Sequence, residues 1–295
     1  MIDWSRLQSL RLRARAVAEG VLAGSHASTK RGSGVEFAGN RAYVVGDDLR
    51  LLDRRATARH DRPFVRELET DTERALLLLV DASASMGFCG KDGAASKLAY
   101  AAMLAGGLLR VAERSGDPVG VEFLGGVGAS GLRPRLGGES VERALFVLER
   151  ARAGGDLHDD LAPVDQVVAR ALRSARRGSV IVFFSDLVDL PDEAARRLAA
   201  LALGRRTLVV CRVLDPEEAT FPFREPLRLV PLEGDRTPVE TNADVARDAY
   251  LARLRGVREL WERGTPCRFV DATTSDDPVA VVRAILGAAA RRRAE

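Results

Sequence analysis

Three oxygen-bearing side chains follow one strongly apolar stretch of the sequence. Residues 76–80 are all Leu or Val and run directly into Asp81, which is followed by Ser83 and Ser85. An uninterrupted apolar run of this length predicts a strand buried on both faces, as in a parallel sheet. One carboxylate and two hydroxyls on a tight turn offer hard oxygen ligands, which suit Mg²⁺ or Mn²⁺ rather than zinc. The sequence therefore predicts a divalent-metal site at the carboxyl end of this strand, where open α/β sheets place their ligand sites.

A second carboxylate follows a second apolar run. Residues 180–184 contain only Val, Ile and Phe and lead into Ser185 and Asp186. Two neighbouring parallel strands that both end in Asp would bring Asp81 and Asp186 to one place. Taken alone, Asp186 more often indicates a loop start or a turn cap. The metal-binding interpretation therefore depends on Asp81, Ser83 and Ser85 together, with Asp186 added to them.

The chain around these residues alternates strands with helices, which predicts a parallel sheet with helical crossovers. Further strands are expected at 119–124, 207–213 and 267–270, with a short hairpin piece at 132–136. Helices are expected at 94–114, 140–152, 161–176, 192–203, 242–263 and 278–293, and an irregular loop or edge hairpin at 221–240. The fold class is α/β, a doubly wound, mostly parallel sheet spanning residues 72–295.

Residues 1–71 are expected to form an extension laid against that domain, because they are too few for a core of their own. Residues 4–22 have the spacing of an amphipathic helix, 24–34 form a flexible link, and 64–68 are β-like. Between them lies a dense set of charges: Asp47, Asp48, Arg50, Asp53, Arg59 and Arg62. We favour an ion-pair network, with Arg50 and Arg59 as bidentate partners of carboxylates, over a partner-docking surface.

Composition excludes several classes of function. The 45 basic residues nearly balance 42 acidic ones, and no basic run is interleaved with aromatic residues, so nucleic-acid binding is not expected. The three cysteines and three histidines are scattered without zinc-ligand spacing. The sequence has no amino-terminal signal region and no stretch long enough to span a bilayer, which predicts a cytoplasmic protein without membrane insertion.

The order of motifs resembles a known superfamily. The sequence DASAS before Met86 and Gly87 is similar to the DxSxS motif of von Willebrand factor A-like domains, which is the first loop of their metal-ion-dependent adhesion site. FFSDL at 183–187 resembles the third loop of that site. The resemblance implies that Asp81, Ser83, Ser85 and Asp186 surround Mg²⁺. An acidic residue of a client protein then completes the coordination, which is binding chemistry and not catalysis.

The resemblance can be restricted to one family within this superfamily. The segments that indicate it are residues 41–69, the sequence RRGSVIVFFSDLVD and the sequence LDPEE at 214–218. Together they resemble a bacterial family catalogued as domain of unknown function fifty-eight, over nearly the whole chain from Gly34 onward. Members of this family often accompany AAA+ ATPases of the MoxR type. The resemblance implies a non-enzymatic adaptor that links such an ATPase to client proteins during their assembly or maturation.

Two positions depart from the family pattern. Arg54 stands where the family usually has Trp, and the second metal loop reads Ala-Gly-Gly-Asp-Leu at 153–157, without its usual Thr. Asp156 can supply an oxygen in place of that Thr, but it also adds negative charge, as do Asp159 and Asp160.

Two other functions therefore stay open. One is a structural scaffold with a degenerate metal site. The other, more remote, is a metal-dependent phosphohydrolase with Asp81 as nucleophile, although Ser83 stands where such enzymes carry their second Asp.

Overall fold

The computed structural model describes residues 9–23, 36–43, 52–53, 57–58, 62–69, 74–91, 93–157, 160–188, 190–232 and 237–290. It divides into two compact units, residues 27–73 and the remainder, 1–26 with 74–295. In the smaller unit, β1 (Glu36–Ala42) pairs antiparallel with β2 (Phe64–Glu69), which confirms the predicted β structure near 64–68.

Only part of the charged set in the smaller unit can be placed. Asp53 is buried and its backbone N–H donates to the carbonyl of Phe64 (2.8 Å), whereas Arg62 is exposed. Asp47, Asp48, Arg50 and Arg59 lie outside the described residues. The ion-pair network and the packing of this segment on the main domain therefore stay predictions.

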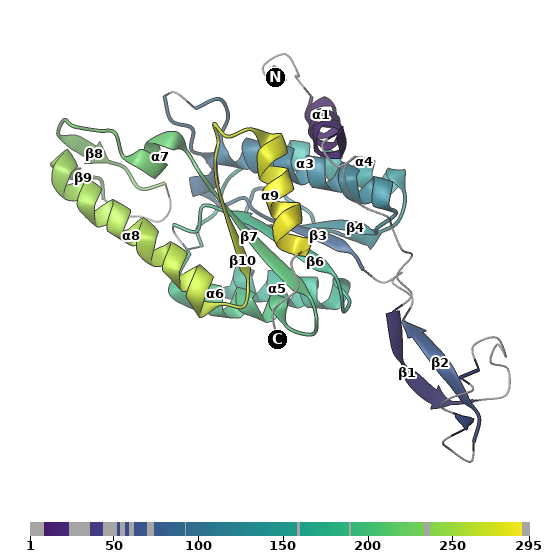
Figure 1. Cartoon of the computed structure of the whole chain (residues 1–295). Coiled ribbons are helices and arrows are strands. Elements are labelled where there is room, and N and C mark those ends of the chain that lie inside the picture. The colour runs from purple at the N-terminus through teal and green to yellow at the C-terminus, as the bar shows by residue number, and fades with distance from the viewer. Residues whose placement is uncertain are drawn as a thin grey trace. The chain divides into compact units, whose positions relative to one another are not determined.

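The larger unit is built on one six-stranded sheet with the order β10-β7-β6-β3-β4-β5 (Figure 1). Every neighbouring pair is parallel except β4 and β5, which are antiparallel. The strands are β3 (Leu76–Asp81), β4 (Val119–Leu124), β5 (Leu132–Arg135), β6 (Val180–Ser185), β7 (Thr207–Leu214) and β10 (Arg268–Thr273). The predicted fold class, a doubly wound and mostly parallel sheet, is confirmed.

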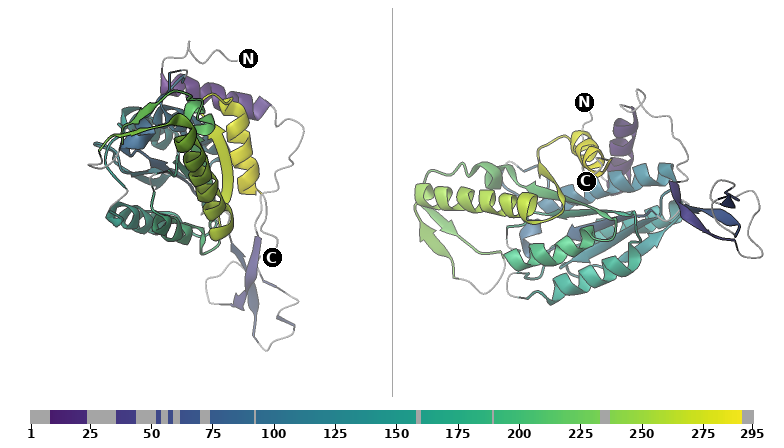
Figure 2. Two further views of the ribbon diagram at one scale, coloured as in Figure 1. Left: turned by 90° about the vertical axis from the view of Figure 1, so that its left-hand side faces the viewer. Right: turned by 60° about the horizontal axis from the view of Figure 1, so that its bottom comes forward.

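Helices cover both faces of this sheet, as the two views of Figure 2 show. One face carries α1 (Leu10–Ala23), α3 (Lys97–Ser115), α4 (Gly138–Arg150) and α9 (Pro278–Ala290). The other carries α5 (Ala162–Ser174), α6 (Asp192–Ala199) with the short helix η5 (Ala200–Ala202), and the carboxyl-terminal half of α8 (Ala243–Gly264). None of the helices in the described part of the chain is both long enough and apolar enough to cross a bilayer.

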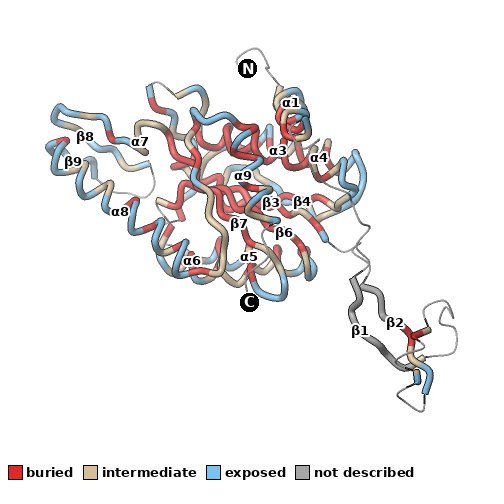
Figure 3. The backbone as a smooth tube through the Cα atoms, in the orientation of Figure 1, coloured by how far each residue is buried: buried red, intermediate tan, exposed pale blue. Residues whose placement is uncertain are grey.

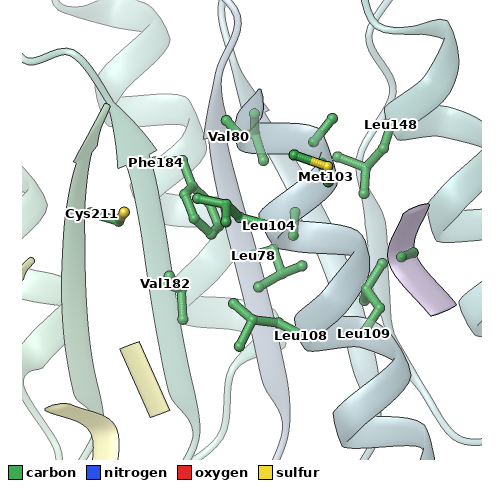
Figure 4. Close-up of a cluster of buried hydrophobic side chains, with 14 of the residues drawn as sticks. Leu78, Val80, Met103, Leu104, Leu108, Leu109, Leu148, Val182, Phe184 and Cys211 are labelled. Atoms are coloured by element: carbon green, nitrogen blue, oxygen red, sulfur yellow. The ribbon is translucent and has the colours of Figure 1, made fainter. Parts of the chain in front are cut away.

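The apolar run of β3 is explained by these two layers. Leu78 and Val80 pack among α3 and α9 side chains on one face, where Figure 4 shows them beside Leu104. Leu77 and Leu79 point to the opposite face and pack against α5 and α6. Because successive side chains of a strand alternate between faces, a central strand covered on both sides needs an apolar residue at every position.

The strands that come after β3 in the sequence lie on both sides of it in the sheet, and this arrangement determines where the polar loops meet. It first passes through α3 to β4 on one side, and later enters β6 on the other side of β3. Such a reversal of strand order opens a crevice at the carboxyl ends of the strands. The register pairs Val80 with Phe184, so the last residues of the two strands, Asp81 and Ser185, are neighbours there.

The region after β7 differs most from expectation. A short helix, α7 (Pro216–Thr220), was not predicted. Within 221–240, β8 (Leu227–Leu229) and β9 (Val239–Thr241) form a hairpin-like pair, but as a separate small sheet and not as an edge of the central one. Figure 3 shows this pair and the neighbouring part of α8 as mostly exposed.

Helix α1 belongs to the larger unit, where it packs closely on α3. Ala14, Val17, Ala18 and Val21 form its buried face, in agreement with the amphipathic helix predicted over 4–22. Gly106 and Gly107 of α3 allow the approach. A Cβ at Gly106 would lie 2.8 Å from the Cβ of Ala14, and one at Gly107 would lie 2.5 Å from Cγ1 of Val17, closer than packed methyl groups come. The absence of side chains at this point of α3 therefore permits the α1–α3 contact.

We predict that Gly106→Ala lowers stability relative to Gly256→Ala. Both changes improve intrinsic helix propensity equally, by up to about 1 kcal/mol. Only Gly106 meets a neighbour, because a Cβ at Gly256 has open space around it. Overpacking should cost Gly106→Ala about 1–3 kcal/mol more than its control, measured by urea unfolding. Equal stability of the two variants would contradict the packing of α1 on α3.

Candidate functional site

Asp81 ends β3 and is held by two hydrogen bonds. Its side chain is buried, with 1% of the residue exposed. Oδ1 accepts the backbone N–H of Ser83 (2.9 Å), and Oδ2 accepts the hydroxyl of Ser185 (2.6 Å) from the end of β6. The carboxylate of Asp81 thus joins the first and third loops of the predicted site.

The two serines of the first loop converge. Ser83 and Ser85 are both buried, and their Oγ atoms lie 3.2 Å apart. Ser83 is the residue before the short helix η4 (Ala84–Gly87) and Ser85 lies within it, so the contact between their hydroxyls joins the start of this helix to its first turn. The spacing that suggested three oxygens on one turn is therefore matched by the geometry.

The second loop lies directly beside the first. The N–H of Gly154 donates to the carbonyl of Ala82 (2.9 Å), and the N–H of Ala84 donates to the carbonyl of Gly155 (3.1 Å). Asp156 follows in this loop and is half-buried. Asp160 is exposed and accepts the N–H of Ala162 at the start of α5, whereas Asp159 lies outside the described residues.

Asp186 follows β6 and is engaged by a cation from this chain. Its Oδ2 lies 2.6 Å from Nζ of Lys97, and its Oδ1 accepts the N–H of Val188 (3.1 Å). Between them Leu187 adopts φ 63°, a left-handed backbone rare for Leu, and its N–H donates to Oγ of Ser185 (2.9 Å). The third loop is thus fixed by hydrogen bonds from backbone N–H groups to the side chains of Ser185 and Asp186.

Lys97 is a residue of this site that the sequence did not indicate. It is the first residue of α3, after the capping residue Ser96, and only 1% of its side chain is exposed. Its Nζ also lies 2.6 Å from Oε1 of Glu218 in α7. The ring of Phe88 lies 5.7 Å from the same nitrogen, within the range of a cation–π contact.

Glu218 is held in turn by the start of α7. Its Oε2 accepts the N–H of Asp215 (2.9 Å), and Asp215 accepts the N–H of Glu217 (2.9 Å), which is the reciprocal pattern of a capping box. Asp215 also accepts the N–H of Gly90 (2.9 Å), which ties α7 to the loop after β3. The sequence LDPEE at 214–218 therefore has a structural role next to the site.

The charges of the site are not balanced. Burial and the nearby charge of Asp186 raise the pKa of Asp81 from 3.8 to about 7, although hydrogen bonds from Ser185 and Ser83 oppose this. Burial alone would lower the pKa of Lys97, but the carboxylates of Asp186 and Glu218 outweigh it and raise that pKa. Burial raises the pKa of Glu218, against the attraction of Lys97. In the part of the chain that the structure describes, Asp81 is thus a carboxyl group without a cation of its own.

This arrangement fits a hard divalent cation in part. Its donors are oxygens only, and those of Asp81, Ser83 and Ser85 come from one buried turn. Across the described residues, no three His, Cys, Asp or Glu side chains are grouped so that they could hold a metal. The serine hydroxyls would therefore have to be ligands, as the DxSxS pattern implies. The predicted contributions of Asp156 and Asp186 stay predictions.

Comparison with known proteins agrees with the resemblance. A family model described as protein of unknown function DUF58 matches residues 39–259, and the chain belongs to this family. Uncharacterized proteins of Mycobacterium bovis and Mycobacterium tuberculosis are 32% identical to it over 219 residues. The match covers 73% of this chain and 66% of theirs, so the chain spans about two thirds of the length of these relatives.

Solved structures with similarity to the chain share less sequence. Conserved hypothetical protein BatB from Bacteroides thetaiotaomicron is 17% identical, with a TM-score of 0.40, over 72% of this chain and 97% of that one. An aerotolerance-related membrane protein from Bacteroides fragilis is 14% identical, with a TM-score of 0.43, over 73% and 98%. A von Willebrand factor type A protein from Catenulispora acidiphila is 15% identical, with a TM-score of 0.37, over 75% and 42%.

We predict that Lys97→Met destabilises the fold far more than Lys91→Met. The first change leaves the buried Asp186 and the partly buried Glu218 without a cation, which costs about 3–5 kcal/mol for a broken buried pair. The second removes an exposed ammonium and should change stability by less than about 0.5 kcal/mol. Urea unfolding measures both, and adding Glu218→Gln to Lys97→Met should recover part of the loss. A Lys97→Met cost no larger than that of Lys91→Met would contradict the buried ion pair.

We also predict a pH dependence of stability that belongs to Asp81. Because the pKa of Asp81 is higher in the folded chain, at about 7, than its ordinary 3.8, the folded state holds the proton more tightly. The contribution of Asp81 to the free energy of unfolding is then fully present below about pH 4 and is lost as pH rises through 7. In chelator, Asp81→Asn should lack this decline in stability, whereas Asp165→Asn, at an exposed position of α5, should keep it. If the free energy of unfolding depends on pH in the same way in wild type and in Asp81→Asn, the pH dependence does not come from Asp81.

Proposed function

We propose that this chain is a protein-interaction module that captures a partner at the carboxyl ends of β3 and β6. The observation that carries the proposal is the convergence of Asp81, Ser83 and Ser85 with Asp186 at the point where the strand order reverses. Reversal points in open α/β sheets are where ligands bind.

The resemblance supplies the finer part of the proposal. It implies that the module acts as an adaptor between an AAA+ ATPase of the MoxR type and client proteins, during their assembly or maturation. Mg²⁺ or Mn²⁺ would be held by Asp81, Ser83 and Ser85, with Asp186 and Asp156 as further oxygen donors. The ion would supply positive charge and a coordination position for an acidic side chain of the client.

A second candidate is supported by Lys97. An ammonium 2.6 Å from both Asp186 and Glu218 already supplies positive charge at the place where the third loop would meet a metal. Under this candidate the chain is a scaffold whose site is completed by its own lysine and needs no divalent ion. Both candidates are interaction functions, and metal binding separates them.

We predict that Mg²⁺ and Mn²⁺ bind wild type in calorimetric titrations, and that Asp81→Ala and Ser83→Ala/Ser85→Ala weaken binding at least about tenfold, or 1.4 kcal/mol. Asp165→Asn is the control, because it removes an exposed carboxylate that pairs with Arg197 and is not one of the predicted donors. If the scaffold candidate is right, wild type binds neither ion and Lys97→Met gains binding. Identical titrations of wild type and Asp81→Ala would rule out the metal site.

The adaptor role has its own test. Tagged wild-type chain should recover an AAA+ ATPase from extracts of the native host in Mg²⁺ but not in chelator, and Asp81→Ala should fail in both. If the ATPase is recovered equally with Mg²⁺, with chelator and with Asp81→Ala, the scaffold candidate is favoured. Extracts that yield no ATPase under any condition would refute the adaptor role while leaving the metal titration to stand by itself.

A further inference from the structure

A groove of about 610 Å³ opens next to the candidate site. It begins at Ser85 and Asp186 and runs between α7, the β8–β9 pair and α8. Its volume lies within the range of about 300–1,000 Å³ typical of ligand pockets.

One wall of this groove, the apolar wall, consists of Leu229, Val230, Leu232 and Val239. These side chains are 42%, 64%, 51% and 56% exposed. They are four of the ten strongly exposed large apolar side chains in the described ranges, and all four come from β8, β9 and the stretch between them. Single exposed apolar residues are ordinary, but a gathering of them in a concave surface indicates a binding site.

An aromatic cluster gives the groove a fixed base. Phe221 is buried, and its ring lies 5.2 Å from that of Phe223 in an edge-to-face contact and 5.4 Å from that of Tyr250 on α8. Phe221 adopts φ 47° where α7 ends, a strained conformation for a residue of this size. The packing of its ring compensates for that strain, so this base is already formed before a partner binds.

The end of the groove nearest the site is acidic. Asp186, Glu217 and Glu218 are its charged members, and no Lys or Arg occurs among the described residues that line it. Lys97 lies behind this end, fully buried, and is shared between Asp186 and Glu218. Three carboxylates face one ammonium, so the end carries an excess of negative charge.

We propose that the groove binds an extended segment of a partner protein in which apolar side chains adjoin a Lys or Arg. The apolar side chains pack on Phe221, Phe223 and the apolar wall, and the basic side chain reaches Glu217 and the Asp186–Glu218 end. The matching of charge favours this segment over an acidic one. The inference rests on the proposed function, because it takes the same site to be a protein-interaction surface, and it names the chemistry of the partner.

Three fluorescein-labelled peptides test this proposal by fluorescence anisotropy in chelator near neutral pH. They share one run of Leu and Val residues and end in Arg, Glu or Gln residues. Wild type should bind the Arg peptide at least about tenfold more tightly than the Glu peptide, with the difference reduced at high salt. Equal affinities, a preference for the Glu peptide or no binding of any peptide would overturn the proposal.

Matched variants locate the binding surface. Val230→Ser/Leu232→Ser should weaken the Arg peptide at least about tenfold, because buried apolar anchors dominate such interfaces. Leu136→Ser/Leu203→Ser changes two equally exposed residues outside the groove and should leave affinity within about twofold. Glu217→Gln should weaken the Arg peptide selectively, and Glu225→Gln, on an exposed residue outside the lining, should not. All positions except Glu217 are exposed, so the variants should fold, which circular dichroism verifies.

Two results separate this inference from the proposed function. If the Glu peptide becomes the tighter ligand when Mg²⁺ is added, metal-bridged capture is right and the basic segment is wrong. If wild type self-associates in sedimentation velocity and Val230→Ser/Leu232→Ser abolishes that association, the occupant is a second copy of this chain and the proposal fails. Arg-peptide binding that is unchanged by Asp81→Ala but lost in the groove variant supports the groove even where no metal binds.

Discussion

The surroundings of the candidate site depend on one buried ammonium group. Nζ of Lys97 lies 2.6 Å from carboxylate oxygens of both Asp186 and Glu218, at the first residue of α3. A buried carboxylate without a cation costs several kcal/mol. The loop after β6 can therefore bury Asp186, and α7 can bring the partly buried Glu218 beside it, because α3 begins at this point and supplies the cation. One side chain joins three elements that lie far apart in the sequence.

The same charge arrangement limits what the site can bind. Lys97 serves Asp186 and Glu218, and Asp81 is left with hydrogen-bond donors but no cation among the described residues. Burial, together with the nearby negative charge of Asp186, raises the pKa of Asp81. A ligand that brings positive charge would oppose this rise, whether the charge comes from a divalent ion or from a basic side chain. Both proposed partners would supply this positive charge: a metal ion would bring it with an acidic client, and a basic segment would bring it into the groove.

Most of the fold could be predicted from the sequence because its central strands are buried on both faces. Residues 76–80, 119–124 and 180–184 are apolar at nearly every position, and the structure places β3, β4 and β6 there within one residue. The convergence of Asp81, Ser83 and Ser85 could also be predicted, since one turn contains all three. Lys97 and Glu218 could not, because their contact spans 121 residues and depends on how α3 and α7 meet. A signal existed nonetheless: only three of the 45 basic residues are Lys, at positions 30, 91 and 97.

The choice of Lys over Arg at position 97 has a physical reason. An ammonium is a compact point charge on a flexible stem, so one nitrogen can contact two carboxylates in a small buried space, whereas a guanidinium needs a wider planar site. The carboxylates do not depend on Lys97 for their orientation: Asp186 accepts the N–H of Val188, and Glu218 accepts the N–H of Asp215. The backbone therefore fixes where the acidic groups lie, while a side chain supplies the opposing charge. A site built in this way keeps its geometry when another cation takes over that charge, which is the property that exchange between an internal lysine and a partner's cation requires.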